Sequence, residues 1–191
     1  CGANLCWVYQ SMKITDTTVF TSGGNSPMGY TIPATIGAKL ASPEKAVFGI
    51  LGDGGFQMNL QELQTIKYLK LNIKLFIYNN FGYGIIKQFQ DTYMDSRYEA
   101  SGKGYSQPDF KKFADLYDFE YRKIQQLSDL NSVDFISDKS IIFDVILHSN
   151  TEIETKTEMG RVINDQFPYQ SEEEFAANNK YFVENFNYNR P

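Results

Sequence analysis

Asp53 and Asn80 are the two side chains whose types and positions best suit the binding of a metal ion and a phosphate group. Asp53 lies in a glycine-rich turn at residues 52–55 (GDGG), and Asn80 lies 27 residues further on, within residues 79–82 (NNFG). Carboxylate and amide oxygens suit Mg²⁺, which also accepts phosphate oxygens and water. Glycines let backbone N–H groups approach phosphate oxygens closely. The pattern therefore predicts a magnesium ion held against a diphosphate, which itself carries most of the negative charge.

The elements around this pair must bring its two members together. Residues 45–51 and 73–78 are apolar runs typical of buried parallel strands. Between them, residues 56–70 carry apolar side chains every three to four positions, which predicts a helix. A right-handed crossover places Asp53 and Asn80 at the same carboxyl edge of the sheet, where such folds bind ligands. The positive end of the helix dipole would also favour phosphate there.

Other known phosphate and metal motifs do not fit this segment. A dinucleotide-binding turn needs G-x-G-x-x-G, and the sixth position is Gln57. The chain has no Gly-Lys-Ser/Thr tripeptide of a phosphate loop and no EF-hand pattern of acidic residues. An ordinary β-turn remains the alternative for Gly-Asp-Gly by itself. The asparagines at positions 79 and 80 favour the metal site.

The later segments continue the alternation of strand and helix. Residues 120–124 and 141–147 are predicted strands, and residues 108–116 a short helix. Residues 127–138 are expected to form a connecting helix and turn. Residues 93–107 are rich in Ser, Gly and Tyr, which predicts a surface loop near the mouth of the site.

At this point the sequence resembles a known family. Residues 36–55 are similar to the signature of thiamine diphosphate-dependent enzymes, and the spacing to Asn79-Asn80 agrees. The closer resemblance is to the carboxyl-terminal domain of the acetolactate synthase group, through residues 22–24, 28–30, 36–41 and 56–63. It implies a three-layer α/β/α fold with a mostly parallel central sheet. Residues 1–150 would bind thiamine diphosphate and Mg²⁺, and residues 151–191 would form a tail.

The resemblance implies roles for individual residues of this chain. Asp53 and Asn80 match the metal ligands, and the Gly82 carbonyl completes them. The other matches are to groups that contact the cofactor: Gly54 and Gly55 on the diphosphate, a second phosphate loop at Gly2, Ala3 and Asn4, and the backbone of Ser26 and Met28 on the aminopyrimidine. Met28 also matches the residue that bends the cofactor, whereas its sequence context alone favours core packing at a helix start.

The implied activity is that of a carboligase acting on a 2-keto acid such as pyruvate, with decarboxylation followed by carbon–carbon bond formation. The alternatives are a thiamine diphosphate-dependent 2-keto acid decarboxylase and a non-catalytic cofactor-binding domain. Related enzymes activate the cofactor with a Glu from an amino-terminal domain, usually the partner subunit's. Glu62, in the middle of the predicted helix, is expected to be structural or solvated. We therefore expect a domain of a longer enzyme that has no catalytic residue of its own and is inactive alone.

One aromatic position departs from the acetolactate synthase pattern. Phe89 stands where that group typically has a Trp that shapes the pocket for the second substrate. A Phe is smaller and lacks the indole donor, so other acceptors are admitted. Phe89 and Tyr83 could equally be core or interface aromatics.

Composition excludes several classes of protein. The net charge of −5 argues against a nucleic-acid surface, and no apolar stretch reaches the 18 residues of a membrane helix. The aromatic content of 15% suggests subunit contacts, and a homodimer or homotetramer with the missing amino-terminal domains is expected. Cys1 and Cys6 are too few for a disulfide framework, so Cys6 is expected to be buried and the protein cytoplasmic. His148 is expected at a cap or the surface.

The segment after residue 150 changes character, with several acidic residues followed by asparagines and aromatics. An extended tail packed on a neighbouring domain is favoured over a lid that closes on the cofactor.

Overall fold

The computed structural model describes residues 1–154, 158–161 and 165–186. The chain divides into two units, residues 1–152 and residues 153–191, which are described separately below.

The first unit is organised by a sheet of four parallel strands in the order β1-β2-β4-β3. The strands are β1 (Val47–Gly52), β2 (Ile73–Asn79), β3 (Glu120–Ile124) and β4 (Ile141–Ile146). All four were predicted within two residues at either end. Gly52 pairs with Tyr78, so the residues that follow β1 and β2 emerge side by side at the carboxyl edge.

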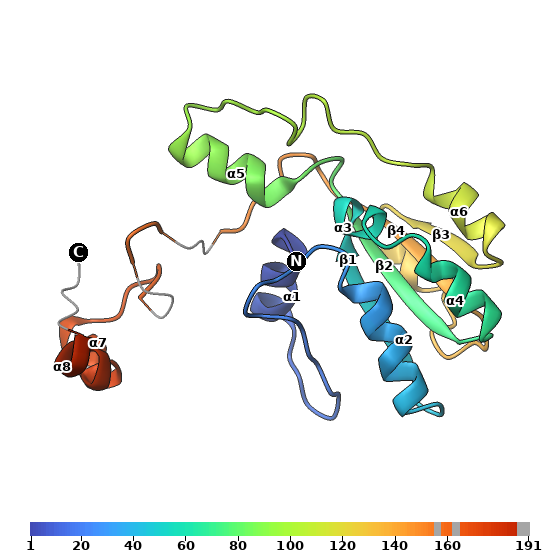
Figure 1. Cartoon of the computed structure of the whole chain (residues 1–191), viewed down its shortest axis with the longest axis horizontal. Helices are drawn as coiled ribbons and strands as arrows, with labels where there is room; N and C mark the ends of the chain where they lie inside the picture. Colours follow the sequence, from blue (N-terminus) through green and yellow to red (C-terminus); the bar gives the residue numbers. More distant parts are fainter. Residues whose placement is uncertain (155–157, 162–164, 187–191) are drawn as a thin grey trace. The chain divides into compact units, whose positions relative to one another are not determined.

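Helices cover the sheet and its carboxyl edge. They are α1 (Ala3–Ser11), α2 (Thr31–Ala41), α3 (Asp53–Gln57), α4 (Glu62–Tyr68), α5 (Gly84–Tyr93) and α6 (Phe110–Leu116), with a 3₁₀ turn, η1 (Leu127–Leu130). Helices α2 and α4 lie on the same side of the sheet in Figure 1. Together with α6 they bury the larger core, which includes Ile32, Leu63, Leu75, Ala114 and Ile142.

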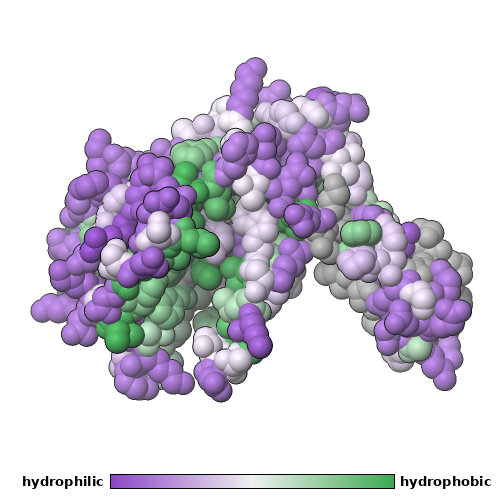
Figure 2. All heavy atoms as spheres, turned by 180° about the vertical axis from the view of Figure 1, so that it is seen from behind, coloured by the Kyte–Doolittle hydropathy of each residue, from purple (hydrophilic) through white to green (hydrophobic). Residues whose placement is uncertain are grey.

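A second core lies on the other face of the sheet. Phe76 and Phe143 stack with ring centroids 4.4 Å apart, and Phe135 and Leu130 pack against them. The sheet therefore has packed layers on both faces, as the predicted three-layer α/β/α fold requires. Figure 2, the view from behind, shows a band of apolar surface. Among the described helices, none combines the length and apolar character needed to cross a membrane.

Three helix predictions need correction. The single helix expected over residues 56–70 is two helices, α3 and α4, and the first begins at Asp53. Glu62 is therefore the first residue of α4 and not a mid-helix residue; its carboxylate accepts a hydrogen bond from the Thr65 hydroxyl (3.0 Å). The helix expected within residues 127–138 is reduced to η1, whose capping box between Gln126 and Asp129 stabilises one short turn.

The second unit contains α7 (Glu172–Asn178) and α8 (Lys180–Phe186). A capping box between Ser171 and Glu174 begins α7, which explains why the acidic run there starts a helix. Residues 155–157, 162–164 and 187–191 of the predicted tail lie outside the described residues. Its expected packing on a neighbour, like the alternative of a lid, stays a prediction.

Candidate cofactor and metal site

A cavity of about 110 Å³ lies at the carboxyl edge of β1 and β2. Its wall combines the start of α1, the segment before α2, the turn after β1 and the segment after β2. The residues are Cys1, Gly2, Ala3, Asn4, Trp7, Met28, Gly52, Asp53, Gly54, Gly55, Tyr78, Asn80, Gly82, Tyr83, Gly84, Ile85 and Ile86. All the site residues predicted from the sequence are among them except Ser26.

Asp53 is held rigidly at the first position of α3. The Asp53 carboxylate accepts hydrogen bonds from the backbone N–H groups of Gly54 (2.9 Å) and Gly82 (3.0 Å). Asp53 is only 2% exposed. The bond to Gly82 directly joins the segments that follow β1 and β2. Burial raises the pKa of Asp53 above its ordinary value, and the hydrogen bonds offset part of that rise. A bound cation would relieve the cost of burying this charge.

The two adjacent asparagines have different environments. Asn79 donates to the Asp144 carboxylate (2.9 Å), which also accepts from the Tyr121 hydroxyl (2.7 Å), so Asn79 is part of a buried structural network. Asn80 lines the cavity and is 6% exposed. Its side chain makes no hydrogen bond to another residue in the part of the chain that the structure describes, and its amide atoms are open to the cavity. An amide in this position is suited to a ligand that is not part of the chain.

At two glycines a side chain would clash with a neighbouring residue. A Cβ at Gly84 would lie 2.3 Å from the Asn80 amide nitrogen, so this glycine makes room for the Asn80 side chain. A Cβ at Gly54 would lie 2.3 Å from the Tyr83 ring, which therefore rests directly on the Gly54 backbone. The small volume of the cavity is explained in part by this ring.

The predicted second phosphate loop is the beginning of a helix. Ala3 and Asn4 are the first two residues of α1, and Gly2 precedes them with φ of 90°. The Asn4 amide donates to the Ile50 carbonyl (3.4 Å), which ties α1 to β1. The structure thus places the first turn of a helix at the cavity, in the segment where a loop was predicted.

Met28 and Ser26 have different positions. Met28 is 37% exposed and lines the cavity. Its terminal methyl lies 3.4 Å from the point where a Cβ at Gly54 would stand. This position does not agree with core packing at the start of a helix. Ser26 lies outside the cavity wall, in the left-handed region with φ of 43°. Asn59 fixes the segment between Met28 and α2 by donating to the Gly29 carbonyl (2.8 Å).

Tyr105 is a contact that the sequence analysis did not identify. It lies in the segment predicted as a surface loop near the site, but its hydroxyl is close enough to Asp53 to help lower the pKa of that carboxyl, and it accepts a hydrogen bond from the Gln57 amide (3.1 Å). Burial and the charge of Asp53 raise the pKa of Tyr105, so it stays a donor. Its ring also packs edge-on against Tyr83, with centroids 4.9 Å apart. No local pattern marks this residue, because the contact spans 52 positions of the chain.

Three other residues discussed from the sequence do not line the cavity: Phe89, His148 and Cys6. Phe89 is on α5, 39% exposed, and packs against Tyr93 with centroids 4.9 Å apart. His148 is exposed and accepts a hydrogen bond from the Asn150 N–H, in agreement with a surface role. Cys6 lies on α1 and is only half-buried, so the expectation of a buried Cys6 was wrong.

The donor set fits a diphosphate and a hard cation. The described residues contain no group of three or more His, Cys, Asp or Glu side chains that could hold a metal by themselves. One carboxylate, one amide and glycine backbone groups are present instead, and such a site needs phosphate oxygens to complete the coordination of Mg²⁺.

Comparison with known proteins identifies the family. Residues 1–134 match the family model described as thiamine pyrophosphate enzyme, C-terminal TPP binding domain, thiamine pyrophosphate being another name for thiamine diphosphate. The chain is 40% identical over 131 residues to the acetolactate synthase large subunit of Cyanidium caldarium, covering 69% of this chain and 22% of that protein.

Two further relatives agree. The acetolactate synthase of Arthrospira platensis is 38% identical over 125 residues, covering 65% of this chain and 22% of the relative. The large subunit of Lactococcus lactis is 37% identical over 124 residues, covering 64% and 21%. The chain therefore spans about a fifth of the length of these relatives. It belongs to the thiamine pyrophosphate enzyme family and contains the family's C-terminal cofactor-binding domain.

Proposed function

We propose that this domain holds thiamine diphosphate and Mg²⁺ for an acetolactate synthase-like carboligase that decarboxylates a 2-keto acid such as pyruvate and joins the remaining carbons to a second carbonyl. The observation that carries the proposal is the pair formed by the buried carboxylate of Asp53 and the unpartnered amide of Asn80 at one cavity. The named relatives, all acetolactate synthases, support the reaction class.

Each part of the cavity has a defined task in this proposal. Asp53 and Asn80 would bind Mg²⁺ together with the Gly82 carbonyl, and the N–H groups of Gly54 and Gly55 would bind the diphosphate. Met28 would support the cofactor from below. When bound, thiamine diphosphate supplies the electron sink that permits loss of carbon dioxide from a 2-keto acid.

Tyr83 must move for the cofactor to enter. The cavity volume of about 110 Å³ is below the roughly 300 Å³ at which small-molecule sites begin. The Tyr83 ring covers Gly54 from one side, so its rotation would uncover a backbone donor and enlarge the cavity. The energetic cost is moderate, because the ring contact with Tyr105 is the main aromatic packing that the rotation would break.

The remainder of the catalytic apparatus would come from other domains. The proposal includes amino-terminal domains in the same polypeptide, an activating Glu within them, and a homodimer or homotetramer in the cytoplasm. Exposed aromatic and aliphatic side chains such as Phe48, at 45% exposure, would provide part of the contact surface.

The full-length enzyme provides the test. With pyruvate, thiamine diphosphate and Mg²⁺, the expected product is acetolactate, measured by its conversion to acetoin in acid. Acetaldehyde as the main product would instead establish a decarboxylase. Binding of cofactor without consumption of any 2-keto acid would establish a non-catalytic domain.

A further inference from the structure

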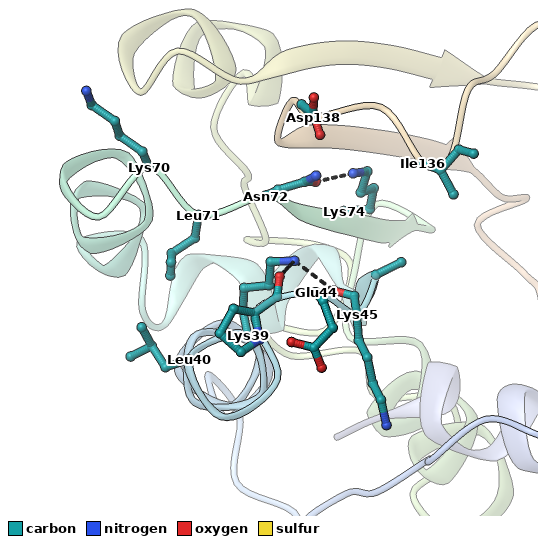
Figure 3. A pocket seen from close by; sticks show the side chains of 12 residues that line it. Lys39, Leu40, Glu44, Lys45, Lys70, Leu71, Asn72, Lys74, Ile136 and Asp138 are labelled. Carbon is teal, nitrogen blue, oxygen red and sulfur yellow. Dashed lines mark hydrogen bonds between the residues drawn. The ribbon is translucent and has the colours of Figure 1, made fainter.

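A second cavity, larger than the cofactor site, lies at the opposite edge of the sheet. Its volume is about 640 Å³, and it opens between the end of α2, the start of β2 and the segment before β4. Figure 3 shows its lining, which includes Lys39 and Lys74. This volume is within the range of small-molecule sites.

The charge of the lining is opposite to that of the chain. Four lysines (Lys39, Lys45, Lys70 and Lys74) and two carboxylates (Glu44 and Asp138) line the cavity, which gives 4 − 2 = +2, whereas the whole chain carries −5. Figure 3 shows the Lys74 ammonium turned toward Asn72 and the Lys39 ammonium turned toward the carbonyls at the end of α2, while the side chains of Lys45 and Lys70 extend away from the cavity.

Both central lysines are fixed by neutral oxygens. Lys39 donates to the carbonyls of Pro43 (2.6 Å) and Lys45 (2.7 Å), at the end of α2. Lys74, which is 1% exposed, donates to the Asn72 side chain and to the Ser137 carbonyl (2.6 Å). Each ammonium has three N–H donors, so one donor of each has no protein acceptor in the described parts of the chain.

The positive charge at this place is not neutralised by ion pairs. Neither lysine has a carboxylate within 4 Å among the described residues, and the seven ion pairs found there involve other lysines and arginines. Burial lowers the pKa of Lys74, the charge of Lys39 lowers it further, and the more distant carboxylates of Asp134 and Asp138 offset part of this shift. A buried ammonium with a second one nearby is costly unless an anion joins them.

We propose that this cavity binds a phosphomonoester, with the phosphate between the ammonium groups of Lys39 and Lys74 and the organic part in the remaining volume. A phosphate dianion offers acceptor oxygens to the free donor of Lys39 and to that of Lys74. The site is independent of the proposed function, since it lies at the other end of β2.

Inorganic phosphate is the probe for a calorimetric titration of the full-length enzyme at constant ionic strength. We expect millimolar or tighter binding by the wild type and a loss of at least about tenfold in Lys39→Met, which removes one charge-assisted hydrogen bond. Lys111→Met removes a lysine from an exposed ion pair far from the cavity lining and is the matched control, with affinity unchanged.

Two further measurements make the outcome decisive. If Lys39→Met does not fold, Lys39→Gln keeps a donor for the turn carbonyls without the charge, and it should lose affinity to a similar degree. Titration with and without thiamine diphosphate and Mg²⁺ distinguishes the two ends of the sheet, because phosphate at the lysine cavity is insensitive to the cofactor. The proposal is overturned if the wild type binds no phosphate up to 50 mM (on the order of the weakest useful affinity). It is also overturned if the Lys39 and Lys111 variants bind phosphate with equal affinity, or if the cofactor displaces the bound phosphate.

Discussion

The two ends of β2 present opposite chemistry. At the carboxyl end, short side chains and glycine backbone groups surround one buried carboxylate, and no lysine lines the cavity. At the amino end, the ammonium groups of Lys39 and Lys74 reach a larger cavity from long side chains. The first arrangement depends on exact backbone placement and suits a cation with a diphosphate. The second depends on charge at the tips of side chains and suits an anion.

The largest expected effect is at the carboxyl end. Asp53→Ala in the full-length enzyme should weaken retention of thiamine diphosphate by at least about 100-fold, or roughly 2.7 kcal/mol, because Asp53 is the one carboxylate among the described residues that line the proposed metal site. Equilibrium dialysis with Mg²⁺ measures this loss. Asp115→Ala, which removes an exposed carboxylate on α6, should change nothing. Unchanged retention in Asp53→Ala would remove the metal assignment.

The adjacent asparagines separate binding from stability. Asn80→Ala should weaken cofactor binding by about tenfold with little change in melting temperature, because its amide supports no other residue described in the structure. Asn79→Ala should lower the free energy of unfolding by about 1–3 kcal/mol, because the buried Asp144 loses a hydrogen bond. The reverse result, with Asn79→Ala the poorer binder and Asn80→Ala the less stable, would contradict the site.

At the amino end of β2, we expect Lys74 to make the stability of the protein depend on pH. Burial lowers the pKa of Lys74 in the folded protein below the ordinary 10.5. Between the lowered pKa and pH 10.5, Lys74 is protonated in the unfolded chain and largely deprotonated in the folded one, so the unfolded chain binds more protons. Stability therefore rises with pH in that window, by at most about 1.4 kcal/mol per pH unit. Lys39, Asp134 and Asp138 are the charged groups that act on Lys74.

The variant that tests this dependence is Lys74→Met. Melting temperatures measured from pH 8 to 10.5 should rise less with pH in Lys74→Met than in wild type, whereas Lys111→Met should follow the wild type. Identical slopes in all three proteins would show that Lys74 titrates normally.

The smallest effect concerns the hydroxyl of Ser137, beside the lysine cavity. Its oxygen is buried and has no hydrogen-bond partner among the described residues. Ser137→Ala should therefore raise the free energy of unfolding by about 0.5–1 kcal/mol in denaturant titrations. Ser140→Ala is the contrasting variant, because that hydroxyl donates to the Leu71 carbonyl (2.5 Å) and its loss should destabilise. Destabilisation of Ser137→Ala to the same extent would reveal an acceptor for its hydroxyl.

Strands β1 and β2 were predictable from sequence because apolar runs ending in glycine or asparagine have few other interpretations. The break between α3 and α4 was not, since Phe56, Leu63 and Ile66 face the core with or without it. The hydrogen bond from Asn59 to the Gly29 carbonyl holds that break, and the partner is 30 positions away. The position of Tyr105 beside Asp53 was not predictable either, because the two residues are far apart in the sequence. The asparagines, by contrast, were placed correctly at the edge because their position follows from the strand itself.

The bond between Asn79 and Asp144 has a consequence for insertions and deletions. Since successive side chains of a strand point to opposite faces, a shift of β2 by one residue that moves Asn80 to the position of Asn79 would bury the Asn80 amide beside Asp144. Phe81 would then take the place of the amide that is proposed to bind the metal. The contact across β2 and β4 thus holds the two strands in one alignment, and it keeps the proposed metal ligands in place without contacting them.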